Sequence, residues 1–255
     1  MQNVGAVAII YEEQKNSSIE IIKSFRKHNP YSSIVIYCDG IVSDIDDICK
    51  EYKCECVVFS DKIGYPASTD LTIPLEYFYR FLYCSNLIKE KYYINLEPDC
   101  LVTGNLILDD IYDSFMISTH QTDWSFNFCG DVLRRNNLMY EIFDLYKLHL
   151  KSLYLESNVF DQIIGGGGMI YNKKFFIEKI FNNWSLFKQR CFSMKELFDK
   201  HKISDEYITF CPNTWYFDYM LSLQLPFYLD KKENILTNDQ ILINNIIHPF
   251  KKYYK

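Results

Sequence analysis

Residues 4–40 read VGAVAIIYEEQKNSSIEIIKSFRKHNPYSSIVIYCDG, and this stretch determines the fold prediction. Residues 4–11 form a continuous apolar run, which is typical of a strand covered on both faces. The segment after it carries apolar residues at helical spacing, and Ser17 with Glu20 has the pattern of a capping box at the start of a helix. Residues 33–38 form a second apolar run. The stretch therefore predicts a strand, a helix and a second strand.

The same alternation continues along the chain. Ser43 is expected to cap a short helix, and residues 54–59 and 92–96 are the next two predicted strands, with a buried helix at 75–89 between them. Strands that alternate with helices predict an α/β fold, with a Rossmann-like, mostly parallel sheet flanked by helices. The second half is less regular, and its expected elements are strands at 114–120, 169–171, 227–229 and 246–247 and helices at 131–151 and 173–200.

The composition excludes several classes of protein. The net charge of −6 gives no general attraction for nucleic acid or an anionic membrane. No apolar run approaches the roughly 18 residues of a membrane span, and no basic segment precedes the first run, so we expect a strand there, no signal peptide and a cytoplasmic location. Nine cysteines without paired CxxC motifs indicate reduced thiols, and neither a disulfide framework nor a zinc site.

Three polar segments follow predicted strand ends. They are Tyr11-Glu12, Asp39-Gly40 and Glu97-Pro98-Asp99. Because ligands of open parallel sheets bind beyond the carboxyl ends of the strands, the three segments should share one rim. In an extended segment Glu97 and Asp99 would point to the same side, where two carboxylates can hold a hard divalent cation. The alternative is a solvated loop that happens to carry two acids.

Three features in the second half are also candidates for a site. The run 165–168 (GGGG) lies between apolar segments, where it allows close approach of backbone to a ligand or is an ordinary turn. Asp205 and Glu206 open an apolar segment, either as charges at a helix start or as a general base. His248 ends an apolar run and could complete a metal site or be structural, and the lysines that follow it could meet phosphates.

Taken in order, these features resemble the nucleotide-sugar-dependent glycosyltransferases of the GT-A fold. That family shares an acidic DxD motif, a glycine-rich loop, an xED motif and a C-terminal histidine. The stretch EYFYRFLYCSNLIKEKYYINLEPDCLVTGNL is similar to the glycogenin-like and galactosyltransferase-like branch, where an arginine-bearing helix precedes the acidic strand end. The chain departs from the family pattern at Glu97, in the order Asp205-Glu206, and in lacking a GKPW-like ending.

The resemblance implies a single glycosyltransferase domain over residues 1–255, with a nucleotide-binding half at 1–120 and a half for sugar and acceptor at 121–255. It implies transfer of a sugar from a nucleoside-diphosphate sugar, UDP-linked, to a hydroxyl on a glycan, protein or small molecule. A manganese or magnesium ion would serve as cofactor, with neither a nucleic-acid partner nor a membrane span.

The resemblance also assigns roles to single residues. Asp99 and His248 would bind the metal, and Glu97 would hold metal-bound water or the ribose. Asp205 or Glu206 would be the base if the reaction inverts, and these acids would bind acceptor if it retains. The residues expected to contact the nucleotide sugar are Ile10, Tyr11, Glu12, Asp39, Arg80, Glu97, Gly166, Gly167 and Lys251.

Two rival functions remain. A sugar-1-phosphate nucleotidyltransferase is also α/β with a metal site, but it normally carries a glycine- and lysine-bearing signature after the first strand, where this chain reads YEEQKNSS. A non-catalytic carbohydrate- or protein-binding module on a degenerate transferase fold is the second rival, and the departure at Glu97 leaves it open.

Overall fold

Four parallel strands form the centre of the sheet, as the alternating pattern predicts. The computed structural model describes residues 2–64, 67–68, 70–108, 116–118, 168–200, 215–216, 236–238 and 245–247. The central strands run in the order β3-β2-β1-β5, and each neighbouring pair is parallel. These strands and their connecting helices are β1 (Gln2–Ile10), α1 (Lys15–His28), β2 (Ile34–Asp39), α2 (Ile45–Tyr52), β3 (Glu55–Phe59), α3 (Thr72–Leu87) and β5 (Tyr92–Leu96).

Shorter strands extend and flank this centre. The sheet continues from β5 through the antiparallel β9 (Ile170–Asn172) to β8 (Met116–Ser118) and β11 (Leu236–Asn238). The mixed α/β fold with a mostly parallel sheet is therefore confirmed. Five further short strands pair at its margins: β7 (Ile107–Leu108) with β1, β4 (Ala67–Ser68) with β10 (Trp215–Tyr216), and β6 (Leu101–Val102) with β12 (Ile246–Ile247).

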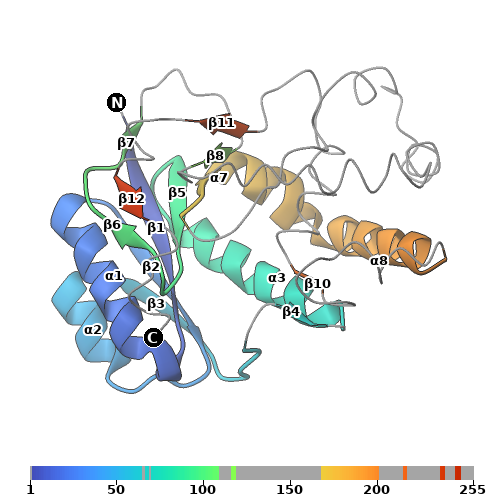
Figure 1. The fold of residues 1–255 in the computed structure, drawn as a ribbon, viewed down its shortest axis with the longest axis horizontal. Helices are drawn as coiled ribbons and strands as arrows, with labels where there is room; N and C mark the ends of the chain where they lie inside the picture. Colours follow the sequence, from blue (N-terminus) through green and yellow to red (C-terminus); the bar gives the residue numbers. More distant parts are fainter. Residues whose placement is uncertain are drawn as a thin grey trace.

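The two faces of the sheet are covered by different helices. Val4, Ala6, Ala8 and Ile10 of β1 join the core cluster of buried residues from α1 and α2. Residues of opposite parity point to the other face, because successive strand side chains alternate. There Tyr37 packs against Tyr77 of α3 and Tyr93 against Phe81, with ring centroids 5.5 and 5.9 Å apart. Figure 1 shows α1 and α2 on one side of the sheet and α3 on the other.

Both predicted helix caps are wrong. A 3₁₀ turn, η1 (Glu12–Gln14), leads directly into α1, which begins at Lys15, so Ser17 lies inside the helix. Ser43 does not cap α2, because the helix begins at Ile45 and Ser43 lies one residue before the cap position; its backbone N–H and its hydroxyl donate to Glu12 instead. The residue before α2 is Asp44, which adopts φ +58° and makes no side-chain capping bond.

The helical pattern after β9 is interrupted. It consists of α7 (Lys173–Phe175), the π-helical η3 (Phe176–Ile180), the 3₁₀ turn η4 (Phe181–Asn183) and α8 (Trp184–Lys200). Aromatic side chains attach this segment to the sheet and to α3: Phe176 packs against Tyr171 at 5.0 Å and Phe187 against Phe78 at 5.6 Å between ring centroids.

The remaining expectations are tested only in part. The expected strand at 246–247 is confirmed as β12, and that at 114–120 is found as the shorter β8. The expected helix at 131–151 and strand at 227–229 lie outside the described residues. Within the described ranges, seven cysteines are free thiols, and no helix is both long and apolar enough to cross a bilayer.

Candidate active site

The predicted rim exists at the carboxyl ends of β2, β1 and β5, on the side of the sheet that α3 covers. Asp39 ends β2, Tyr11 follows β1 and Glu97 follows β5. Tyr77 and Arg80 on α3 meet these three residues. We call these five residues the rim cluster.

Asp39 is held entirely within the protein. Its side chain has no exposed surface, and its Oδ1 lies 3.5 Å from Nη1 of Arg80. Its carboxylate accepts from the backbone N–H of Ile63 at 3.0 Å and of Gly64 at 2.7 Å. Gly64 adopts φ +82°, a backbone conformation that favours glycine. Asp39 thus fixes the loop after β3 against α3, and contact with a base or ribose stays a prediction for it.

Arg80 connects this loop to the rim. Its Nη1 donates to the carbonyl oxygen of Asp61 at 2.6 Å, and its Nε donates to Glu76 at 2.9 Å. The guanidinium carbon also lies 4.8 Å from the centroid of the Phe59 ring. The planar guanidinium of arginine suits such a set of simultaneous contacts. The charge of this nearly buried side chain is compensated by Asp39 and Glu76, so its contact with the donor also stays a prediction.

Tyr77 joins the ends of β1 and β5, a role that the sequence did not predict. Burial raises the pKa of its phenol well above 10, and the neighbouring Tyr11 and Glu97 raise it further. The side chains of Tyr77 and Tyr11 are hydrogen-bonded. Tyr77 lies three residues before Arg80, on the same helix face, so the spacing of the arginine-bearing helix is the signal that could have indicated it.

The two acids lie on a turn and not on an extended segment, which corrects the predicted geometry. The backbone N–H of Cys100 donates to the carbonyl oxygen of Glu97 at 2.9 Å, so residues 97–100 form a β-turn. Pro98 takes the second position of the turn, which its fixed φ favours. The side chain that shares a side with Glu97 is Asn95, whose Nδ2 donates to Glu97 Oε1 at 3.1 Å.

The end of the glycine run lies beside these acids. Gly168, which adopts φ +80°, donates its N–H to the carbonyl oxygen of Asn95 at 2.7 Å. Asn95 returns a bond from its own N–H to Met169 at 3.0 Å. The glycine run therefore reaches the end of β5, two residues from Glu97. Gly166 and Gly167 lie outside the described residues.

The last described strand, β12, lies beside the strand that follows the β-turn at 97–100, which we call the acid turn. β12 pairs antiparallel with β6, with Ile247 opposite Leu101. Figure 1 shows the two strands next to each other. Leu101 lies two residues after Asp99, and Ile247 directly precedes His248. In an antiparallel pair, the chain leads from Ile247 toward His248 in the same direction as it leads back from Leu101 to Asp99.

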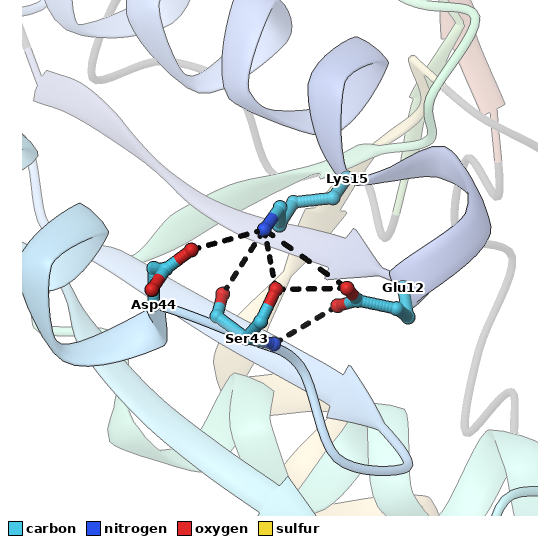
Figure 2. A network of polar contacts seen from close by, with 4 residues as sticks. All are labelled: Glu12, Lys15, Ser43 and Asp44. Carbon is cyan, nitrogen blue, oxygen red and sulfur yellow. Dashed lines mark hydrogen bonds and ion pairs between the residues drawn. The ribbon is translucent and has the colours of Figure 1, made fainter.

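The side chain of Glu12 is engaged within the protein, and its predicted contact with the nucleotide sugar stays a prediction. Figure 2 shows its carboxylate bound to Ser43, with Lys15 in contact with Glu12, Ser43 and Asp44. The backbone N–H of Ser43 and then its hydroxyl lower the pKa of Glu12 below 4.5. These contacts fasten the loop after β1 to the loop after β2. Ile10 is buried in the core, so only its backbone could meet a nucleotide.

The other predicted site residues are not described. Asp205, Glu206, His248 and Lys251 lie outside the described residues. Within the part of the chain that is described, no group of three or more His, Cys, Asp and Glu side chains could hold a metal ion. The described members of the predicted metal site are Glu97 and Asp99.

Comparisons with known proteins give distant similarities. No protein-family model and no curated protein matches the sequence. The chain is similar to the apo structure of the bifunctional glycosyltransferase WbbM, with 11% identity and a TM-score of 0.49, over 94% of this chain and 39% of that one. It is also similar to the Mn/GDP form of core-mannan synthase A (CmsA/Ktr4) from Aspergillus fumigatus, with 12% identity and a TM-score of 0.38, over 72% and 63% of the two chains. This chain thus spans less than two thirds of either protein. A function for it must therefore be inferred from its own residues.

Proposed function

We propose that this protein is a metal-dependent glycosyltransferase that moves a sugar from a nucleoside-diphosphate sugar, UDP-linked, to a hydroxyl acceptor. One observation carries the proposal. Three segments singled out by the sequence meet around the turn at 97–100: Gly168, at the end of the glycine run, bonds to Asn95 before the turn, and β12, directly before His248, pairs with β6 after it. An acid-bearing loop placed by chance would not be expected to gather both other segments.

The side chains on and near the acid turn offer ligand atoms that suit a divalent cation. Asp99 and Glu97 offer carboxylate oxygens, and the chain beside them leads into an imidazole at His248. Manganese and magnesium prefer hard oxygen ligands, and manganese also accepts imidazole. In this proposal Asp99 and His248 bind the ion directly, and Glu97 holds metal-bound water or the ribose. The ion would stabilise the negative charge of the departing nucleoside diphosphate.

The rim cluster would hold the nucleotide part of the donor. Tyr11 and the backbone near Ile10 and Glu12 lie at the end of β1, between the ends of β2 and β5. Asp39 and Arg80 fix the neighbouring loop, which would shape one wall for the base or ribose.

Residues of the second half, 121–255, would bind the sugar, a phosphate and the acceptor. Gly166 and Gly167 would shape the sugar pocket, and Lys251 would meet a phosphate. Asp205 or Glu206 would accept the proton of the acceptor hydroxyl in an inverting enzyme, or bind the acceptor in a retaining one. The acceptor would be a glycan, a protein or a small molecule.

Calorimetry with UDP and a UDP-sugar in the presence of Mn²⁺ tests the metal site. We expect saturable binding that EDTA removes and that Asp99→Ala abolishes with little change in unfolding. Glu97→Gln should weaken binding less than the Asp99 variant. Asp46→Ala, which removes an exposed acid from α2, is the matched control. Unchanged affinity in Asp99→Ala, or after EDTA treatment, would exclude the metal role.

A panel of sugar nucleotides separates the transferase from its rivals. A transferase releases nucleoside diphosphate from one donor of the panel. A nucleotidyltransferase instead forms a sugar nucleotide from a sugar 1-phosphate and a nucleoside triphosphate. A binding module does neither while still binding its ligand.

A further inference from the structure

A cavity lies between the loop after β3, the start of α3 and the start of α8. Its volume is about 410 Å³. Its polar and aromatic lining consists of Lys62, Thr72, Glu76, Trp184 and Lys188, none of which belongs to a motif of the predicted site.

The charge of the cavity favours an anion. Glu76 is the one carboxylate among the described lining residues, and it already accepts from Arg80 Nε at 2.9 Å. Lys62 pairs with Glu13 and Lys188 is exposed on α8. With Glu76 paired to Arg80 and Lys62 paired to Glu13, the exposed Lys188 supplies the positive charge that is available to an anion.

The remaining lining suits the body of a sugar. Trp184 is held in place by Phe187, whose ring stacks on it at 5.3 Å, and by Tyr79 at 5.3 Å. An indole fixed in this way offers a flat apolar surface for the C–H face of a pyranose. Thr72 adds a hydroxyl at the first position of α3; this hydroxyl donates to Asp70 at 2.8 Å, so its oxygen is left to accept. An aromatic wall with a few polar groups is the usual composition of a small-ligand site.

We propose that this cavity binds an anionic saccharide, one that carries a carboxylate or a phosphate ester. The binding rests on the cavity alone, and only its use as an acceptor site rests on the proposed function. Two chains of contacts connect it to the rim: Lys62 pairs with Glu13 after β1, and Glu76 pairs with Arg80, which pairs with Asp39. A saccharide bound there would lie next to the proposed donor.

The test is calorimetry with four probes in the absence of nucleotide and metal: D-glucose 6-phosphate, D-glucuronic acid, D-glucose and inorganic phosphate. We expect saturable binding of at least one anionic sugar, about 10-fold or more tighter than glucose or phosphate, because a charged hydrogen bond contributes that much. The sugar that binds identifies the anion as carboxylate or phosphate. Binding of neither sugar would overturn the proposal, as would equal binding of glucose or of inorganic phosphate.

A matched pair of variants locates the site. Lys188→Glu changes an exposed side chain of the cavity and should weaken binding about 10-fold or more. Lys195→Glu makes the same change two turns along α8, outside the cavity, and should leave binding unchanged. Equal affinities of the two variants would place any binding elsewhere. Because the titrations contain neither UDP nor Mn²⁺, failure here leaves the donor-binding test of the proposed function unaffected.

Discussion

Ile247 is the Cα partner of Leu101, and this pairing carries the C-terminal part of the chain to the strand that follows the acid turn. Asn245 extends the contact: its carbonyl oxygen accepts from the N–H of Thr103 at 2.8 Å, and its side chain donates to Asn105 at 3.0 Å. A Cβ added at Gly104 would lie 2.3 Å from Oδ1 of Asn245. Any larger residue at position 104 would therefore force the side chain of Asn245 to move.

Gly104→Ala should loosen this junction. The side chain of Asn245 must move and give up its bond to Asn105, so we expect a loss of about 1 kcal/mol in the free energy of unfolding, measured with urea. Because Asn245 lies three residues before His248, Mn²⁺-dependent UDP binding should weaken as well. Asn245→Gly in the same chain removes the clash and should restore part of the stability of Gly104→Ala. A Gly104→Ala protein with unchanged stability and unchanged UDP affinity would contradict this prediction.

Asp39→Asn should destabilise the protein strongly. The amide would turn a donor toward the N–H groups of Ile63 and Gly64 and would leave Arg80 without its buried carboxylate. Removing one partner of a buried pair costs about 3–5 kcal/mol, and the lower end applies because Arg80 keeps Glu76.

Glu76→Gln is the control for this pair. Glu76 also contacts Arg80, but its side chain is half exposed, so its loss should cost no more than about 1 kcal/mol. Urea unfolding of both variants measures the difference. Equal losses would show that the buried position of Asp39 is not what matters.

The strands of the sheet could be predicted from the sequence more accurately than the residues at which the helices begin. The apolar runs of β1, β2, β3 and β5 and the alternation with helices are strong local signals, and they give the parallel sheet. Helix starts were predicted less well because side chains far away in sequence compete for the cap residues. Ser43 is of a type favoured at caps, yet it lies one residue before the cap position, and its hydroxyl accepts from Lys15 and donates to Glu12.

Only those residues of the candidate site that directly follow a strand could be predicted from the sequence. Parallel strands bring their carboxyl ends to one edge, so Tyr11, Asp39 and Glu97 could be grouped from the sequence. Asn245 could not, because its part depends on which strand β12 joins. Tyr77 could be indicated only through its i, i+3 spacing to Arg80, since its contacts depend on how α3 packs. The i, i+2 rule failed for Glu97 and Asp99, because Pro98 makes this segment a turn.

Glu12 should titrate below its ordinary pKa of 4.5. The backbone N–H of Ser43, and secondly its hydroxyl, donate to the carboxylate and favour its charged form. Since the folded-state pKa is lowered, the stabilisation is present above pH 4.5 and is lost as the pH falls through the folded-state pKa. Ser43→Ala removes only the hydroxyl, so the pKa should rise part of the way to 4.5 in an NMR titration. Ser17→Ala, inside α1, should leave it unchanged, and a Glu12 pKa at or above 4.5 in the unmodified protein would contradict the network.

Tyr77→Phe should impair donor binding while preserving the fold. The substitution keeps the ring that packs against Tyr37 but removes the hydroxyl that bonds to Tyr11 beside Glu97. We expect a loss of about 1 kcal/mol in the free energy of unfolding and a several-fold weaker affinity for UDP with Mn²⁺, because Tyr11 is no longer held at the end of β1. Tyr93→Phe is the matched control: Tyr93 is just as deeply buried on the same face of the sheet, but near the start of β5, away from the rim. If both variants bind UDP equally well, Tyr77 serves only the core; if only Tyr77→Phe loses affinity at similar stability, its hydroxyl positions the nucleotide-binding end of β1.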